Sequence, residues 1–147
     1  IKPGVPNLFG LVQGKTNEVQ PGKRPLSSMS PTIVTKDGKT IMVLGSPGGS
    51  RIITIVVGTL MNVVDHGMNI QEAVNAPRLH HQWLPDRISM ERFGFSADVI
   101  KQLQAMGHTI NEGGNQGVAQ VIIFNQKDNL LEGGLDRRAA DGGASGK

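Results

Sequence analysis

The feature that most restricts the fold of this sequence is a strand that passes through a glycine-rich turn into a long apolar helix. Residues 40–44 are β-prone and apolar on both faces, which is typical of a strand buried between layers. Residues 51–66 are rich in Ile and Val, but this stretch is too long for an ordinary strand. Ser50 is a candidate N-cap and Gly67 a stop, so we expect a central helix that is buried nearly all round.

The rest of the chain alternates between strands and short helices. An Asp37-Gly38 turn joins residues 32–35 to the buried strand and predicts a β-hairpin. Apolar periodicity and turn signals predict further strands at residues 87–91, 108–111, 118–124 and 130–131. They also predict helices at residues 71–75, with Asn69 as the cap, and at residues 96–106. The fold class expected from this order is α/β (α+β), with mainly antiparallel strands around a buried helix.

The length of 147 residues fits a single domain, which divides by composition into three parts. Residues 1–31 carry five prolines and are expected to form an extended arm, with a disordered leader as the alternative. Residues 32–132 hold the sheet and helices, and residues 133–147 form a glycine-rich tail without periodicity. The arm begins abruptly in loop-like sequence, which favours a single partial domain of a longer protein.

Composition excludes several classes of protein. The net charge of +3 is spread along the chain and aromatic residues make up only 3%, so a nucleic-acid surface is not expected. The longest apolar stretch, residues 52–64, is interrupted by polar side chains and is too short to span a membrane. The absence of cysteine removes disulfides and thiol nucleophiles. No residue pattern implies a metal or another cofactor.

The glycine loop, residues 46–50, is a candidate anion site. Adjacent glycines between a strand and a helix leave backbone N–H groups free, and the helix dipole adds partial positive charge there. The loop matches neither the phosphate-binding P-loop pattern nor the dinucleotide fingerprint. A carboxylate or a developing oxyanion is therefore the expected ligand, and a tight turn without function is the alternative.

The serine strip, residues 24–31, is a second candidate site. It holds three hydroxyls, those of Ser27, Ser28 and Ser30, between two prolines that restrict the backbone. Short hydroxyls on a rigid segment can bind a carboxylate. The alternative is that these serines only close turns.

Longer strings containing both motifs resemble the small subunit of the γ-glutamyltranspeptidases. They are KRPLSSMSPTIV at residues 23–34 and GSPGGSRII at residues 45–53. Further strings, similar to that subunit in the same order, are KPGVPN at residues 2–7, GLV at 10–12, NAPR at 75–78 and HHQWLPD at 80–86. The resemblance covers nearly the whole chain.

The resemblance implies a fold, a reaction and site residues. The family consists of N-terminal-nucleophile hydrolases with a four-layer αββα sandwich, in which a threonine released by self-cleavage attacks γ-glutamyl amides such as glutathione. By resemblance, Ser27 and Ser28 would bind the α-carboxylate of the γ-glutamyl group. The amides of Gly48 and Gly49 would then stabilise the tetrahedral oxyanion.

Other parts of the family's active site are not matched in this sequence. None of the seven threonines has the nucleophile's sequence context, so we expect the nucleophile, and an acidic substrate-binding residue, upstream in the small subunit. An arginine is expected from the large subunit. The resemblance thus implies two partners, the large subunit and the upstream part of the small subunit, a periplasmic or extracellular location, and no activity of this chain alone. A non-catalytic assembly or carboxylate-binding module is the alternative.

Two clusters of polar residues have less specific interpretations. His80, His81 and Trp83 are expected to pack structurally, because no carboxylate completes a metal-ligand set with them. Asp136, Arg137, Arg138 and Asp141 are expected to form a salt-bridge cluster on the surface, with little effect on stability and no catalytic role.

Overall fold

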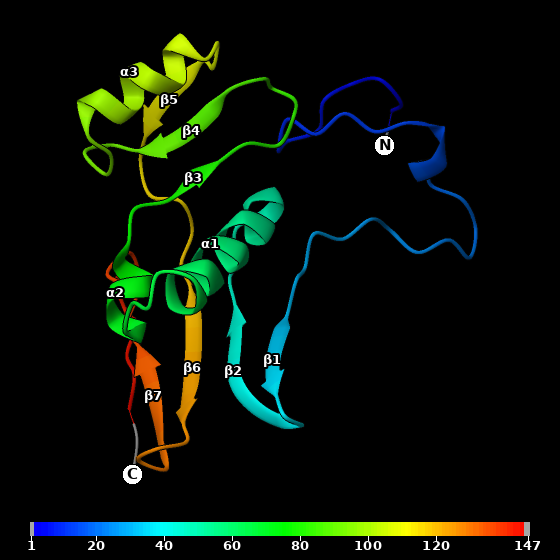
Figure 1. Ribbon diagram of the computed structural model, residues 1–147. Helices are drawn as coiled ribbons and strands as arrows, with labels where there is room; N and C mark the ends of the chain where they lie inside the picture. The colour runs from blue at the N-terminus through cyan, green and yellow to red at the C-terminus, as the bar shows by residue number, and fades with distance from the viewer. Residues whose placement is uncertain (1, 146–147) are drawn as a thin grey trace.

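The computed structural model describes residues 2–145. Its elements follow one another along the chain as an arm, a hairpin, two helices, a small mixed sheet with a third helix, and a second hairpin (Figure 1). The elements are η1 (Lys15–Asn17), β1 (Thr32–Lys36), β2 (Lys39–Gly45), η2 (Gly49–Arg51), α1 (Ile52–Val64), α2 (Ile70–Asn75), β3 (Leu79–His80), β4 (Ile88–Glu91), α3 (Ala97–Ala105), β5 (Ile110–Gly113), β6 (Gln120–Asn125) and β7 (Leu130–Gly134). The α+β class and the mainly antiparallel pairing are confirmed.

The larger sheet has the order β1-β2-β6-β7, and all its neighbours are antiparallel. The predicted first hairpin is confirmed, and its turn places Asp37 at φ 51° and Gly38 at φ 75°. These left-handed conformations are what a two-residue hairpin turn needs, and Asp and Gly adopt them at low cost. The β2 strand pairs with β6 so that Met42 lies opposite Ile123 and Leu44 opposite Val121.

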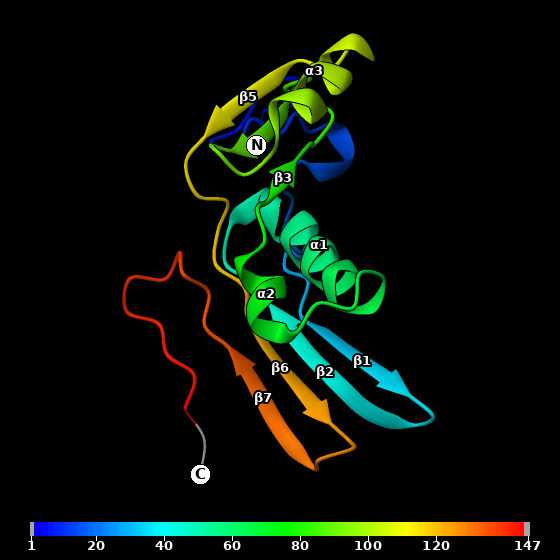
Figure 2. The ribbon, with the colours of Figure 1, turned by 60° about the vertical axis from the view of Figure 1, so that its left-hand side comes forward.

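Helices α1 and α2 cover one face of the larger sheet (Figure 2). Between helices and sheet lies the apolar core, which consists of Met42, Leu44, Ile55, Val56, Ile70, Val74, Ala119 and Val121. The predicted second helix is confirmed with its cap. The Asn69 side chain accepts a hydrogen bond from Glu72 N, and the Glu72 carboxylate accepts one from Asn69 N.

The expectation that the central helix is buried all round is wrong for this chain. Its buried residues, Ile55, Val56 and Thr59, lie on the side that faces the sheet. On its other side Ile53 and Val57 remain 51% and 47% exposed, because no other segment of residues 2–145 covers them. The expectation that the preceding strand, β2, is buried on both faces is also wrong, because Val43 remains 46% exposed. An apolar composition predicts that a segment is covered, but it does not identify the segment that covers it.

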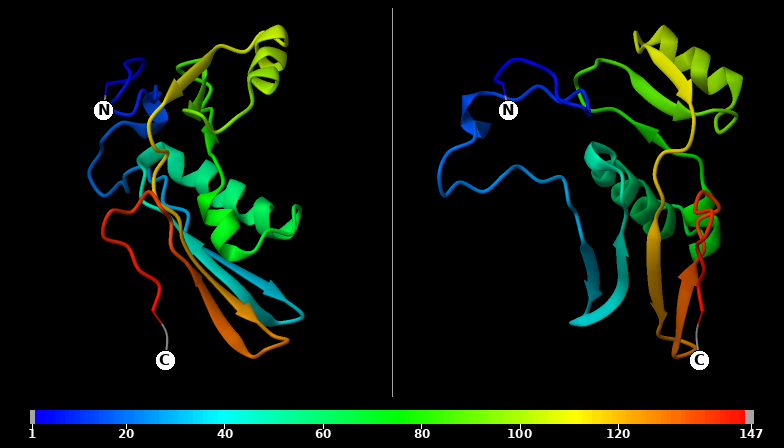
Figure 3. Two further views of the ribbon diagram at one scale, coloured as in Figure 1. Left: turned by 90° about the vertical axis from the view of Figure 1, so that its left-hand side faces the viewer. Right: turned by 180° about the vertical axis from the view of Figure 1, so that it is seen from behind.

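The smaller sheet has the order β3-β4-β5, and α3 packs against β5 (Figure 3). Its β3 and β4 strands are antiparallel, whereas β4 and β5 are parallel and are connected through α3. All four residues of β4 are buried. The chain then passes through residues 114–119 into β6, so this segment joins the two sheets.

The arm loops out from the connection between β3 and β4 and returns at β1, and the tail leaves the end of β7 and turns back beside that strand (Figure 3). In the arm, Pro6 and Val12 form an isolated antiparallel bridge, and η1 adds one short turn. The tail beyond β7 contains neither helix nor strand up to residue 145. No helix within residues 2–145 has the length and apolar character needed to cross a membrane.

Candidate functional site

The two predicted motifs lie at the same end of the larger sheet. Because β1 and β2 are antiparallel and Thr32 pairs with Leu44, the serine strip enters β1 where β2 passes into the glycine loop (Figure 1). A hollow of about 990 Å³ has Val43, Ile122 and Leu131 in its wall. It reaches Pro31 at the end of the strip and Gly45 just before the loop, but none of the four predicted site residues lines it. The candidate site is therefore defined by the strip and the loop.

Two of the three serines of the strip, the predicted site residues Ser27 and Ser28, have hydroxyl groups that can donate to a ligand. Ser27 Oγ accepts a hydrogen bond from Met29 N at 3.1 Å, which leaves its own hydrogen free. The backbone carbonyl of Ser28 accepts from Ser30 Oγ at 3.1 Å, and Ser28 Oγ has no partner within the described part of the chain. Ser27 is exposed and Ser28 half-buried, so a ligand can reach both.

The glycine loop leaves two backbone N–H groups without a partner. Gly48 has φ 146° and Gly49 φ 57°, a region that side chains strongly disfavour. The Gly48 carbonyl accepts from Arg51 N at 3.1 Å, but neither glycine N–H donates to any atom of residues 2–145. These amides stand at the N-terminal end of η2 and α1, where partial positive charge favours an anion.

The arm covers this loop through Phe9. A Cβ atom built on Gly49 would lie 2.7 Å from Phe9 Cε1, so the ring lies directly on the glycine. Only a residue without a side chain fits beneath the ring in this conformation. The close contact and the positive φ both require glycine at this position.

The histidine cluster is partly as expected. His80 is buried, and its ring nitrogens lie 2.8 Å from Thr54 Oγ1 and 2.8 Å from Gln82 Oε1, which confirms a packing role. His81 contacts Asp86 at the surface at 3.1 Å. Trp83 is 71% exposed, so the expectation that it packs is wrong within this chain.

Ser50 does not cap the central helix as expected. Its hydroxyl donates to Gln82 Oε1 at 2.7 Å, and α1 starts after the η2 turn with Arg51 at its N-cap.

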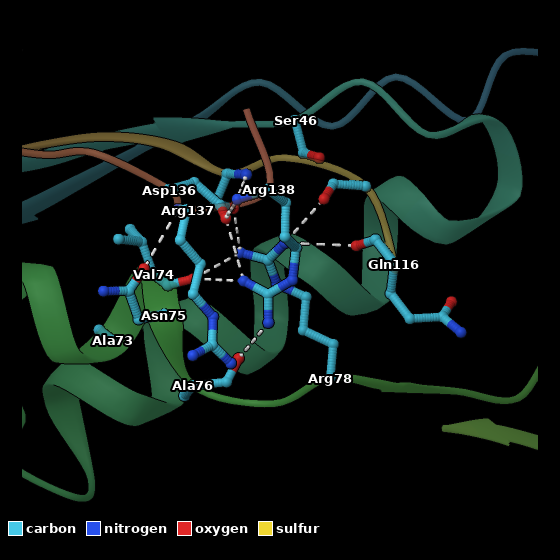
Figure 4. Close-up of polar contacts among 12 residues, drawn as sticks. Ser46, Ala73, Val74, Asn75, Ala76, Arg78, Gln116, Asp136, Arg137 and Arg138 are labelled. Atoms are coloured by element: carbon cyan, nitrogen blue, oxygen red, sulfur yellow. Dashed lines mark hydrogen bonds and ion pairs between the residues drawn. The ribbon is translucent and has the colours of Figure 1, made fainter. Parts of the chain in front are cut away.

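The expectation of a surface salt-bridge cluster in the tail is wrong. Asp136 is 2% exposed, and its carboxylate binds Arg78 at 2.6 Å and Arg138 at 3.0 Å. Arg138 also pairs with Glu91 of β4. Figure 4 shows the side chains of Arg78 and Arg138 converging beside the carbonyls of α2. These four residues form what we call the buried ion cluster.

Hydrogen bonds from the backbone complete the buried ion cluster. Arg138 donates to the carbonyls of Val74 and Ala76, and Arg78 donates to those of Val74, Gln116 and Gly117. In return the backbone N–H groups of Ala119 and Arg138 donate to Asp136, and those of Arg78 and Gln116 donate to Glu91. Two positive and two negative charges are thus enclosed with their partners.

The pKa values of the two acids follow from these contacts. Burial alone would raise the pKa of Asp136, but hydrogen bonds from Ala119 N, Arg138 N and the two guanidiniums outweigh it and lower the pKa. Burial likewise opposes ionisation of Glu91, and the Arg138 guanidinium together with two backbone amides lowers its pKa. Burial lowers the pKa of the Arg78 guanidinium, which nevertheless remains charged beside Asp136.

The sequence contained little signal for this cluster. Its members lie far apart in the chain and belong to a loop, a strand end and an aperiodic tail, so no spacing rule connects them. Arg78 is the last residue of the NAPR string and Glu91 the last of the expected strand at 87–91, and neither pattern indicates an ion pair. The available hint was compositional, because two arginines and two aspartates in a tail of small residues need partners if the tail packs.

Comparison with known proteins identifies the fold and the family. The family model described as gamma-glutamyltranspeptidase matches residues 1–146. The glutathione hydrolase proenzyme of Escherichia coli strain K12 is 55% identical over 140 residues, covering 95% of this chain and 24% of the relative. This chain therefore spans about a quarter of the length of that curated relative.

Two solved structures agree over nearly the whole chain. The γ-glutamyltranspeptidase of Helicobacter pylori has a TM-score of 0.90 at 51% identity, covering 95% of this chain and 76% of that chain. The γ-glutamyltranspeptidase of Pseudomonas nitroreducens also has a TM-score of 0.90, at 45% identity, covering 100% of this chain and 77% of that chain. The fold is that of the N-terminal-nucleophile hydrolases. Within that class, the chain belongs to the γ-glutamyltranspeptidase family.

The buried ion cluster gives the first testable prediction. Replacing Asp136 with Asn leaves two buried guanidiniums facing a single remaining acid, and we expect the free energy of unfolding to fall by about 3–5 kcal/mol. Urea denaturation of the complete protein measures this, with the exposed Asp141→Asn as the control. A loss below about 1 kcal/mol, within the range of an exposed ion pair, would contradict the role assigned to the cluster.

The same cluster predicts how stability depends on pH. Because the pKa values of Glu91 and Asp136 are lowered in the folded state, their contribution is complete above the unfolded values of about 4. It is lost as pH falls through the lower, folded values. We expect the free energy of unfolding to decrease below about pH 4. In Asp136→Asn its slope against pH should correspond to about one fewer proton taken up on unfolding. Equal slopes for wild type and variant would argue against it.

Proposed function

We propose that this chain forms the substrate-binding and oxyanion-stabilising part of a γ-glutamyltransferase. The complete enzyme hydrolyses glutathione and other γ-glutamyl amides, or transfers the γ-glutamyl group to amino acids or peptides. The observation that carries this proposal is the pair of unbonded amides at Gly48 and Gly49, at the sheet end where the serine strip enters. Membership of the γ-glutamyltranspeptidase family supports it.

The proposed roles follow from the chemistry of each group. The hydroxyls of Ser27 and Ser28 donate hydrogen bonds to the α-carboxylate of the γ-glutamyl group, which fixes the substrate before reaction. The amides of Gly48 and Gly49 donate to the oxygen that becomes negative when the γ-carbonyl is attacked. Since both amides are held in place before reaction, they stabilise this charge without reorganising.

The nucleophile and the remaining substrate contacts come from partners. The proposed partners are the large subunit and the upstream part of the small subunit of the same enzyme. By resemblance to the family, the nucleophile is a threonine of the upstream part, whose own α-amino group accepts the proton. In a polypeptide of residues 1–147 all seven threonines are internal, so none has a free α-amino group. The proposed location is the periplasm or the extracellular space, and the proposed chemistry uses no cofactor.

Serine replacement tests the substrate-binding role. In the complete enzyme we expect Ser27→Ala and Ser28→Ala each to raise KM for a γ-glutamyl anilide about 10- to 100-fold. A hydrogen bond to a charged group contributes about 1.5–3 kcal/mol, and each 1.4 kcal/mol is a factor of ten. Ser96→Ala, at the start of α3 on the smaller sheet, is the control. A KM within twofold of wild type in both variants would refute the assignment.

Complementation tests whether the chain works only as part of an enzyme. We expect purified residues 1–147 alone to release no product from a chromogenic γ-glutamyl anilide, because the nucleophile is lacking. Addition of the large subunit and the upstream part of the small subunit should restore turnover. Persistent turnover by the isolated chain would overturn the proposed division of roles. Failure of the assembled complex to react would favour a non-catalytic assembly or carboxylate-binding module.

A further inference from the structure

The Gln82 side chain connects three segments around the glycine loop. Its Nε2 donates to the Phe9 carbonyl in the arm at 2.9 Å and to the Leu84 carbonyl at 2.9 Å. Its Oε1 accepts from Ser50 Oγ at 2.7 Å and lies 2.8 Å from His80 Nε2. One amide group thus uses both of its ends in four contacts.

These partners fix the orientation of the Gln82 amide. The Phe9 and Leu84 groups are carbonyls, which can only accept, so the NH₂ end must face them. The Oε1 end must then face Ser50 and His80, where it can only accept. In a neutral imidazole the hydrogen of His80 therefore lies on Nε2.

The fixed imidazole connects the network to helix α1. With its hydrogen on Nε2, His80 offers Nδ1 as an acceptor, and Thr54 Oγ1 lies 2.8 Å from it. The Thr54 hydroxyl has a single hydrogen, so it shares this hydrogen between His80 Nδ1 and the Arg51 carbonyl, 3.0 Å away at the start of α1. Because His80 is buried, this chain of hydrogen bonds does not compete with water at the ring.

We propose that Gln82 is a positioning residue for the glycine loop, holding Ser50 from one side and the arm above Gly49 from the other. This inference rests on the proposed oxyanion role of the loop. It concerns a residue that does not touch the reacting atoms and acts through its neighbours.

The local geometry explains why the loop needs such support. The turn at residues 49–51 is closed by two backbone hydrogen bonds, from Arg51 N to the Gly48 carbonyl and from Ile52 N to the Gly49 carbonyl, and neither uses the N–H of Gly48 or Gly49. No side chain caps η2 or α1. Ser50 directly follows Gly49, so its bond to Gln82 holds the residue next to the second amide. Loss of that bond gives the two glycines, which many backbone conformations suit, more freedom to reorient.

The arm depends on the same side chain. The Phe9 ring lies on Gly49, while the Phe9 carbonyl accepts from Gln82 Nε2. A Cβ atom built on Gly10 would lie 3.1 Å from Pro85 Cδ and 3.6 Å from Gln82 Nε2, so the arm backbone packs against both side chains. Gln82 contributes the hydrogen bond that attaches the arm above the loop.

Replacing Gln82 with Met tests the proposal in the complete enzyme, since Met has a similar length but neither an amide donor nor a carbonyl acceptor. We expect kcat for a γ-glutamyl anilide to fall about 10- to 100-fold, less than or comparable to the loss of an oxyanion donor. We expect KM to stay within threefold, because the serine hydroxyls are untouched. An unchanged kcat would overturn the proposal.

Gln71 provides a matched control. Its side chain also bridges backbone groups with both ends, donating to the Leu135 carbonyl at 2.6 Å and accepting from Leu135 N at 3.1 Å. It lies in α2 against the end of β7, away from the glycine loop. Gln71→Met should lower the melting temperature while leaving kcat within twofold. An equal loss of kcat in both variants would indicate general destabilisation and overturn the proposal.

A conservative variant separates the two ends of the amide. Gln82→Glu keeps an acceptor for Ser50, but its second oxygen faces the Phe9 and Leu84 carbonyls without a hydrogen to donate. The variant thus removes the arm contact and keeps the Ser50 contact. We expect its kcat to fall at least threefold, and a wild-type kcat would overturn the role of the Phe9 contact.

Nitrogen-15 NMR of the histidine rings gives a readout independent of turnover. It should show His80 with its hydrogen on Nε2 in wild type, and loss of this preference in Gln82→Met. Retention of the same tautomer in the variant would contradict the network.

The serine variants keep this inference distinguishable from the proposed function. If Ser27→Ala and Ser28→Ala raise KM as expected while Gln82→Met leaves kcat unchanged, only the positioning role fails. If neither the serine variants nor Gln82→Met affects turnover, the assignment of the site itself fails.

Discussion

The buried ion cluster is the interaction on which the rest of this structure depends. It gathers the end of α2, the start of β3, the end of β4, the segment that joins the two sheets and the tail at one point. Removing four charges from water is costly, and Coulomb attraction compensates only when the remaining hydrogen-bonding groups are satisfied. Here the guanidiniums donate to backbone carbonyls, and the carboxylates accept hydrogen bonds from backbone N–H groups. The cluster therefore favours one relative placement of these segments, because any other leaves a buried charge unpaired.

The sequence predicted the elements whose causes are local. The Asp37-Gly38 turn needs only its own two residues to adopt positive φ, and the cap at Asn69 needs only Glu72 three residues later. The β-prone apolar run of β6 indicates a strand in the same way. Such signals lie within a few residues of each other, so one sequence suffices to find them. The family strings added the identity of the site residues, which local patterns alone left as possible turns.

The features that were missed have causes far apart in the chain. The Asp136 side chain is buried because Arg78, 58 residues earlier, meets it, and composition alone made the same residue a surface charge. The exposed side of α1 was not predicted, because its apolar residues indicate that it packs against another segment but do not show that this segment lies within residues 2–145. Ser50 satisfied the composition rule for an N-cap, yet its hydroxyl binds Gln82 instead. In each case a tertiary partner outweighed a local preference.

The proposed site divides its work between two kinds of donor, and their chemistry explains the division. A substrate carboxylate is charged before and after reaction, so rotatable hydroxyls that adapt to it contribute binding that is the same in both states. The oxyanion exists only near the transition state, so its donors must already point to it. Backbone amides in a strained glycine turn meet this need only if the turn is held. Support from Phe9 and Gln82, contributed by segments distant in the chain, is the physical condition under which two glycines can act as a catalytic group.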